Sequence, residues 1–244
     1  MTGTPTGRRR AQLSYLGHLL AVTPLLRWLI IGYTIPSPPT DRRRCVRCAA
    51  RLWPGACRPS ARCPDCRTPV GPPPYTVEIA AATAAVMLIG SGLHGWELAA
   101  YTAWSMFLIA LGCIDTAVHR LPHHLSAAAT LGFVAFLALA SGTAPTWLAA
   151  VASAVGLAAF HALLHAAAPS GLGLGDVTIT IPVGLALGWL NWRYAVAAAL
   201  LAHITTLLAF TLQRTTRRQL RDQPFGVHLA AASILLAAAA QATR

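Results

Sequence analysis

The sequence contains few charged residues and no lysine. Charged residues make up 11% of the 244 positions and hydrophobic residues 55%, and the mean hydropathy is +0.55. A soluble domain normally holds about 25% charged residues, so this composition excludes one and indicates a membrane protein. Because lysine is absent, the net charge of +12 comes entirely from arginine.

The arginines lack the aromatic neighbours on which single-stranded nucleic acids stack, which argues against a nucleic-acid partner. Eight of the nineteen lie within residues 42–67 and four within residues 214–221. The positive-inside rule places both loops in the cytoplasm, and counting spans from them places residues 115–124 and 169–176 there as well. The expected surroundings of the chain are therefore membrane lipid.

Eight apolar runs suit membrane spans, although the sixth is short. Short spacers separate several of them, so consecutive runs are expected to be antiparallel neighbours. The sequence predicts an all-α membrane protein, a polytopic bundle of about eight transmembrane helices. The runs are Leu13–Ile35, Val77–Leu93, Trp96–Ile114, Leu125–Ala140, Thr146–Ala168, Val177–Leu190, Tyr194–Leu212 and Phe225–Ala242.

No small-residue cleavage site follows the first apolar run, so a removable signal peptide is the weaker of two interpretations. The sequence predicts an uncleaved first span instead. His18 and Arg27 interrupt its apolar character, and we expect them to weaken this helix. The chain then divides into an N-terminal tail and span (1–35), a cytoplasmic loop (36–74) and a seven-span membrane domain (75–244).

The loop holds five of the six cysteines. Cys45 and Cys48 form one Cys-x-x-Cys knuckle, and Cys63 and Cys66 form a second one fourteen residues later. This spacing is typical of a zinc ribbon, in which two turns bring four thiolates into a tetrahedron. Two disulfides are the alternative, but a cytoplasmic loop is reducing. We predict a small zinc-ribbon-like module whose zinc is structural, because four thiolates leave no open position for water.

Two of the seven acidic residues end or begin apolar runs: Asp115 follows the third run and Asp176 precedes the sixth. A charged side chain near hydrocarbon costs about 3 kcal/mol or more, so each needs a reason. One such residue usually caps a helix, packs, or relays protons. Two at the same depth can share a proton across a water molecule, which lets them act as base and acid on a peptide carbonyl.

The stretch SGLGLGDV places Gly173 and Gly175 just ahead of Asp176. Without a Cβ, these glycines permit unusual dihedral angles or close approach to an extended substrate strand. A flexible connector is the alternative. Because Asp176 is predicted to precede a helix and Asp115 to end one, the helix dipoles favour Asp176 as base and Asp115 as acid.

Taken together, these segments resemble the bacterial prepilin leader peptidases, which are GxGD-type intramembrane aspartic proteases. The resemblance covers most of the chain. The motifs that carry it are RCPDCRTPVGPPPYTVE (Arg62–Glu78), IDTAVHRLP (Ile114–Pro122), GLGLGDV (Gly171–Val177), LGW (Leu187–Trp189) and PFG (Pro224–Gly226).

The resemblance implies a multi-pass protein of the bacterial cytoplasmic membrane that cleaves basic leaders from type IV prepilins or pseudopilins at the cytoplasmic face. Asp115 and Asp176 would be the catalytic pair. Gly173, Gly175 and Glu78 are the residues that we expect to position the substrate. Many members also methylate the new amino terminus with S-adenosylmethionine.

Three features depart from the family pattern. His123 stands where an aspartate is usual, and Thr178 stands where a basic residue is common. Residues 25–36, LLRWLIIGYTIP, lack the usual Asn-containing signature. The sequence therefore predicts the peptidase activity and leaves methylation open.

Two other functions remain as alternatives. A proton- or metal-coupled transporter would also use intramembrane carboxylates and histidines, but the chain shows no internal repeat. A catalytically inactive pilin-assembly factor would explain the departures. His161 and His165 lack the intervening glutamate of a zinc metalloprotease helix, so we interpret them as interior residues that hydrogen-bond between helices.

Overall fold

The computed structural model describes residues 5–34, 44–140, 142–169, 171–215 and 223–242. This part of the chain contains helices and loops but no β-strand, and its extended pairing is limited to two isolated bridges. The helices are α1 (Pro5–Thr34), the 3₁₀ helix η1 (Gly55–Cys57), α2 (Thr76–Gly90), α3 (Gly95–Val118), α4 (His123–Ala138), α5 (Ala144–Ala167), α6 (Leu174–Leu190), α7 (Trp192–Thr215) and α8 (Phe225–Ala242).

An α-helix lies on each of the eight apolar runs, which confirms the predicted all-α fold. Four helices are long and apolar enough to cross a membrane: Ser14–Thr34 within α1, and all of α3, α5 and α7. The other four are apolar but shorter. The protein is a membrane protein. Residues 36–43 and 216–222, which carry parts of both arginine-rich loops, lie outside the described residues.

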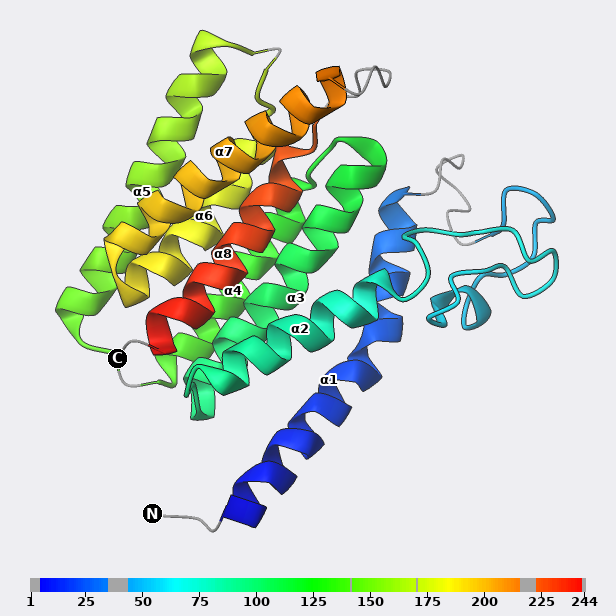
Figure 1. The fold of residues 1–244 in the computed structure, drawn as a ribbon, viewed down its shortest axis with the longest axis horizontal. Coiled ribbons are helices and arrows are strands. Elements are labelled where there is room, and N and C mark those ends of the chain that lie inside the picture. The colour runs from blue at the N-terminus through cyan, green and yellow to red at the C-terminus, as the bar shows by residue number, and fades with distance from the viewer. Residues whose placement is uncertain (1–4, 35–43, 141, 170, 216–222, 243–244) are drawn as a thin grey trace.

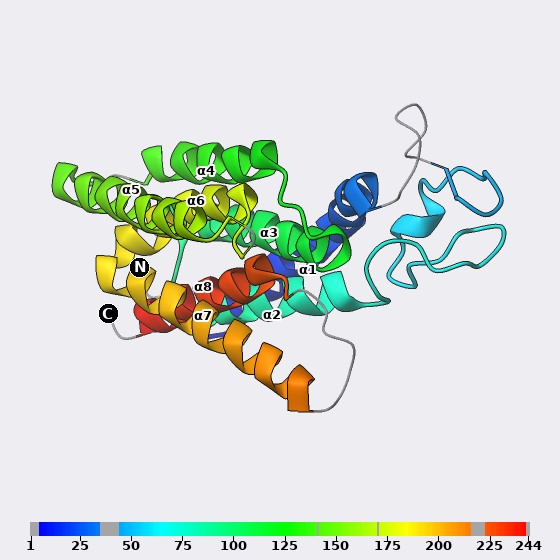
Figure 2. The same ribbon diagram turned by 90° about the horizontal axis from the view of Figure 1, so that it is seen from above.

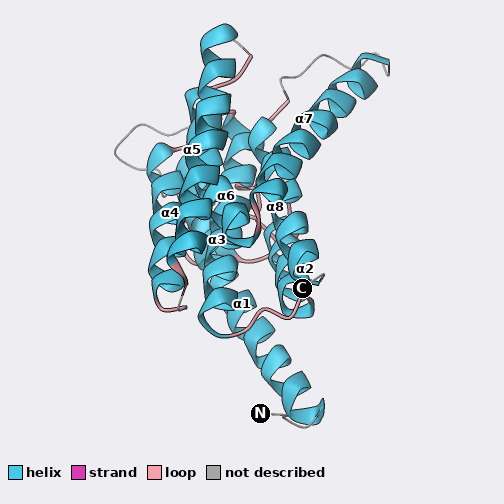
Figure 3. Cartoon of the chain, turned by 90° about the vertical axis from the view of Figure 1, so that its left-hand side faces the viewer, coloured by secondary structure: helices cyan, strands magenta, loops and turns pink. Residues whose placement is uncertain are grey.

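Helices α2 to α8 lie side by side in one bundle, and the cysteine loop lies beyond the C-terminal end of α1 (Figure 1). Seen from above, α4, α5 and α6 lie on one side of α3, and α2, α7 and α8 on the other (Figure 2). The N-terminal half of α1 diverges from the bundle (Figure 3). The α3–α4 and α5–α6 connections lie at the same end as the cysteine loop and the facing ends of α7 and α8 (Figure 1). These are the segments that the charge pattern predicts to be cytoplasmic.

Small residues permit the extensive contact between α5 and α6. Gly184 and Gly188 lie about one turn apart on α6. A Cβ on Gly184 would lie 2.6 Å from the Ala154 Cα, and one on Gly188 would lie 2.5 Å from the Ser153 Cβ. Inside a bilayer the hydrophobic effect does not drive helices together, so close backbone packing of this kind stabilises the pair.

Two buried aromatic side chains of α3 bind the backbone of α6. The Tyr101 hydroxyl donates to the Ala186 carbonyl at 2.6 Å, and Trp104 Nε1 donates to the Pro182 carbonyl at 3.0 Å. Both rings also pack on Phe133 of α4. These contacts fix the position of α6 along α3. These two helices carry the two predicted catalytic aspartates.

Arg27 makes the main polar contact of α1. Its side chain is fully buried, and Nε and one terminal nitrogen donate to the two carboxylate oxygens of Glu78, each at 2.6 Å. The guanidinium also lies 3.3–3.4 Å from the carbonyl oxygens of Pro59, Pro72 and Pro73. The expectation that Arg27 weakens the first helix is therefore wrong, because this side chain joins α1 to α2 and to the cysteine loop.

Glu78→Gln should leave the buried guanidinium of Arg27 without its counter-charge. Breaking a buried ion pair from one side costs about 3–5 kcal/mol, so we expect a clear fall in the thermal unfolding midpoint of the detergent-purified protein. The double variant Arg27→Met/Glu78→Met removes both charges and should recover part of the loss. An unchanged midpoint in Glu78→Gln would contradict the anchoring role of this pair.

Candidate active site

Asp115 lies near the end of α3 and is 5% exposed. Its Oδ2 accepts a hydrogen bond from the backbone N–H of Gly226, 2.8 Å away in the first turn of α8. A Cβ on Gly226 would lie 2.8 Å from the same oxygen, so a glycine is needed there for the carboxylate to fit. The start of α8 therefore holds the first of the two predicted catalytic residues.

Asp176 lies in the first turn of α6, three residues after the N-cap Gly173. The Gly173 N–H donates to Asp176 Oδ2 at 2.9 Å. The sequence predicts Asp176 directly ahead of a helix, whereas α6 starts earlier, at Leu174. The reason is that a carboxylate at the third helical position satisfies the amide of the N-cap residue.

The helix ends do not separate the roles of the two aspartates. The sequence predicts Asp115 as the acid because it ends a helix. Through Gly226, however, Asp115 also faces the N-terminus of α8. Both carboxylates thus lie at a helix N-terminus, so the argument from helix dipoles no longer assigns base and acid.

Leu121, in the loop after α3, lies between the surroundings of the two aspartates. A Cβ on Gly175 would lie 2.7 Å from the Leu121 Cβ and 3.1 Å from its carbonyl oxygen. A Cβ on Gly226 would lie 3.0 Å from the Leu121 Cδ1. The starts of α6 and α8 therefore meet at this residue, and the carboxylates of Asp115 and Asp176 are close enough to interact electrostatically.

The residues predicted to position substrate have different surroundings. Gly173 has φ −77° and ψ 157°, an extended conformation that any residue adopts. Gly175 leaves room for the close approach of Leu121, which belongs to the chain itself. Both oxygens of Glu78 accept from Arg27. Their part in substrate positioning stays a prediction.

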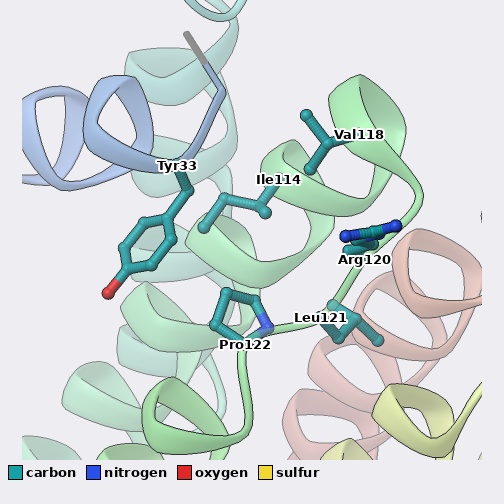
Figure 4. Close-up of a pocket in the computed structure, with 6 residues that line it drawn as sticks. All are labelled: Tyr33, Ile114, Val118, Arg120, Leu121 and Pro122. Atoms are coloured by element: carbon teal, nitrogen blue, oxygen red, sulfur yellow. The ribbon is translucent and has the colours of Figure 1, made fainter. Parts of the chain in front are cut away.

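A cavity of about 670 Å³ lies beside the last turns of α3. Its wall comes from the end of α1, the end of α3 and the loop that follows (Figure 4). Apolar side chains make up most of the lining, with one phenol and one guanidinium among them. The lining residues are Tyr33, Ile114, Val118, Arg120, Leu121 and Pro122. Such a cavity suits an apolar peptide segment.

Two of the three histidines after Asp115 join helices. His124 Nε2 bonds the Tyr33 hydroxyl of α1. His123 Nδ1 lies 3.2 Å from the Thr178 Oγ1 of α6. His123 and Thr178 occupy two positions at which the chain departs from the pattern of the resembled family, so these two departures contact each other across the α4–α6 junction.

The two cysteine knuckles share one local structure. The Cys45 N–H donates to the Ala50 carbonyl at 2.9 Å, and the Cys63 N–H donates to the Thr68 carbonyl at the same distance. In each knuckle the residue after the second cysteine has a left-handed φ, 58° in one and 60° in the other. Two equivalent turns therefore bring the four thiols together.

The four sulfur atoms can hold one metal ion. All lie within 4.8 Å of one another, and the pairs Cys45–Cys66 and Cys48–Cys63 are each 3.6 Å apart. Thiolates at about 2.3 Å from a tetrahedral zinc are about 3.8 Å apart, so the spacing fits. The four thiols are free of disulfides, and the hydrogen bond between Cys66 and Thr68 lowers the pKa of Cys66 to about 6.

Cys57, the fifth cysteine of the loop, does not belong to this cluster. It is 1% exposed in η1, and burial raises the pKa of its thiol to about 11. Cys57 instead packs with Leu52 and with Ile31 of α1 in a small hydrophobic core.

Residues 102–212 match the model of the type IV leader peptidase family. The matched segment, a little under half of the chain, is similar to that family. It runs from within α3 to within α7 and includes Asp115 and Asp176, whereas α1, the cysteine loop, α2 and α8 lie outside it. No curated protein and no solved structure matches the chain.

Two residues contribute to the site through contacts that local sequence patterns do not predict. Leu121 touches both glycines that adjoin the aspartates. Tyr33, outside the matched segment, lines the cavity at the end of α3. Leu121 lies inside the IDTAVHRLP motif, but the contacts through which it and Tyr33 contribute involve partners far away in the chain, which no local pattern indicates.

Gly175→Ala tests the packing between α6 and the loop after Asp115. The added methyl group would meet the Leu121 Cβ and backbone, which cannot swing aside, so α6 has to shift. A shift of about 1 Å between reacting groups costs up to about 100-fold in rate, and we expect a loss of that order in leader cleavage. Gly156→Ala on α5 is the control, because a Cβ there meets nothing within 4 Å. Equal activity in the two variants would contradict the prediction.

Proposed function

We propose that the chain is an intramembrane aspartic endopeptidase of the bacterial cytoplasmic membrane. Its substrates are type IV prepilins or pseudopilins, from which it removes a basic leader peptide at the cytoplasmic face. The observation that carries the proposal is that Asp115 and Asp176, on different helices, have surroundings that meet at Leu121, inside the segment that matches the leader peptidase family.

The pair supplies general base and general acid chemistry. One carboxylate takes a proton from a water molecule between the two, and the water oxygen bonds to the scissile carbonyl carbon. The carbonyl oxygen takes the proton of the other carboxyl, which gives a diol. When the diol collapses, one hydroxyl proton returns to the second carboxyl. The C–N bond breaks, and the leaving nitrogen takes the proton held by the first.

We place the apolar residues that follow the cleaved bond in the cavity beside α3. The bond lies between a basic leader and an apolar helix, and the cavity wall is mainly apolar. Arg120 lines it and repels a basic leader, which disfavours the reverse orientation. The leader then lies on the other side of the carboxylates from Arg120.

The contact between His123 and Thr178 supports an active peptidase over an inactive assembly factor. An acidic and a basic residue at these positions would form an ion pair between α4 and α6. Here the His123 Nδ1 and Thr178 Oγ1 atoms lie 3.2 Å apart and form a hydrogen bond. Because the two replaced residues still bond to each other, the contact between α4 and α6 next to Asp176 is retained.

We further propose that Cys45, Cys48, Cys63 and Cys66 bind a structural zinc ion, which stabilises the fold of the loop. A closed four-thiolate site offers no position for water, so this metal takes no part in the cleavage. Methylation of the new amino terminus with S-adenosylmethionine rests on the resemblance alone. It would be visible as an added methyl group on the cleaved product.

Membranes that contain the wild-type protein should release the leader from a candidate type IV prepilin. Asp115→Asn and Asp176→Asn should each lower the cleavage rate by about 100- to 10,000-fold, because each removes one proton-transfer group. Glu97→Gln, in the first turn of α3 at the opposite end of the helix, should keep full activity. Mass spectrometry of the product measures the result, and equal cleavage by all four proteins would disprove the proposal.

The purified protein should contain about one zinc ion per chain. Cys48→Ser combined with Cys66→Ser removes one ligand from each knuckle and should abolish zinc binding, whereas Cys57→Ser should retain it. Metal analysis of the three proteins checks this. Full zinc content in the double variant would show that the ion lies elsewhere.

A further inference from the structure

His165 lies in the last turn of α5, close to the glycine-rich segment that precedes Asp176. Its Nδ1 is 2.6 Å from the carbonyl oxygen of Leu172. Because a carbonyl oxygen can only accept, Nδ1 carries the hydrogen and the imidazole is the donor. The expectation of a bond between helices does not describe His161, whose Nδ1 bonds the Leu157 carbonyl of its own helix.

The Leu172 carbonyl belongs to the same peptide unit as the Gly173 N–H. That N–H donates to Asp176 Oδ2 at 2.9 Å. In a trans peptide unit, the C=O and the N–H point in opposite directions. His165 and the Asp176 carboxylate therefore hold one peptide unit from its two sides.

This arrangement has two consequences for Asp176. The imidazole restrains the rotation of the peptide unit, which keeps the N–H directed at the carboxylate in a segment rich in glycine and therefore costly to order. Donation to the C=O also polarises the unit and strengthens its N–H as a donor, by about 10–30% per linked bond. Both effects fix the orientation of the Asp176 side chain.

We infer that His165 is a positioning residue for Asp176, acting through the Leu172–Gly173 peptide unit. The inference rests on the proposed peptidase function, because it assigns His165 a part in that reaction. His165 touches neither substrate nor reacting atoms in this role. Its loss should therefore lower kcat while leaving KM unchanged, since the cavity that we assign to substrate lies along α3 and the end of α1.

The test compares His165→Leu with His165→Asn. Leucine is similar in size to histidine but has no hydrogen-bond donor. With it, kcat for prepilin cleavage should fall by about 10- to 100-fold. Asparagine places an amide N–H near the position of Nδ1 and should recover most of that loss. His94→Ala is the control: His94 Nδ1 also bonds a loop carbonyl, that of Gly92 at 3.1 Å, in the connection between α2 and α3.

Hydrogen exchange gives a readout that does not depend on activity. Peptides covering residues 171–176 should exchange faster in His165→Leu than in the wild type, and His165→Asn should restore protection. The His94→Ala protein should show wild-type exchange in this segment. Equal exchange in wild type and His165→Leu would overturn the inference even if no prepilin substrate were available.

The outcomes separate this inference from the proposed function. If the wild type cleaves prepilin, Asp176→Asn does not, and His165→Leu has wild-type kcat, the positioning role is wrong and the peptidase proposal stands. A loss in His165→Leu that appears in KM, or that asparagine does not recover, also overturns the positioning role. If the wild type fails to cleave, the proposed function fails, and exchange alone decides whether His165 orders the segment.

Discussion

A carboxylate at the edge of a bilayer needs polar partners from the protein, because hydrocarbon offers none. Asp115 takes its partner from the backbone of Gly226 at the start of α8, and Asp176 takes its partner from Gly173 before α6. Arg27 does the same for the carboxylate at the start of α2. At this side of the bundle, the starts of α6 and α8 supply backbone donors to Asp176 and Asp115, so the placement of these two helix ends is linked to satisfying the carboxylates.

The kind of donor separates the structural carboxylate of Glu78 from the pair that we propose to be catalytic, Asp115 and Asp176. A bidentate guanidinium neutralises Glu78 and holds both of its oxygens, which suits an anchor between α1 and α2. A backbone N–H orients Asp115 and Asp176 without cancelling their charge, so each remains able to take and release a proton. Two neighbouring carboxylates also repel each other when both are charged, so they are a less stable arrangement than a carboxylate paired with a guanidinium. Packing elsewhere, such as the Tyr101 and Trp104 contacts with α6, has to hold them together.

Sequence patterns predicted the parts of the molecule that depend on local composition. Hydropathy located the eight helices, and knuckle spacing located the four clustered thiols. The errors concern contacts between distant residues. Arg27 is expected from the sequence to weaken the first helix, because its partner Glu78 is 51 residues away. The contact of Asp115 with α8 spans 111 residues. Periodicity carries no information about such pairs. The early start of α6 was readable in principle, since Gly-x-x-Asp can cap a helix, but the glycines were interpreted for substrate instead.

The segment that matches the family is not independent of the N-terminal part of the chain. Trp28 and Ile31 of α1 pack in the same small core as Cys45, Cys57 and other residues of the cysteine loop. Two residues further along α1, Tyr33 closes the cavity beside α3 and contacts His124. The loop therefore positions the end of α1, and the end of α1 shapes the cavity that we assign to substrate. The zinc site that we propose for the loop would therefore act on the proposed cleavage only indirectly, through the placement of Tyr33, and its metal would take no part in the reaction.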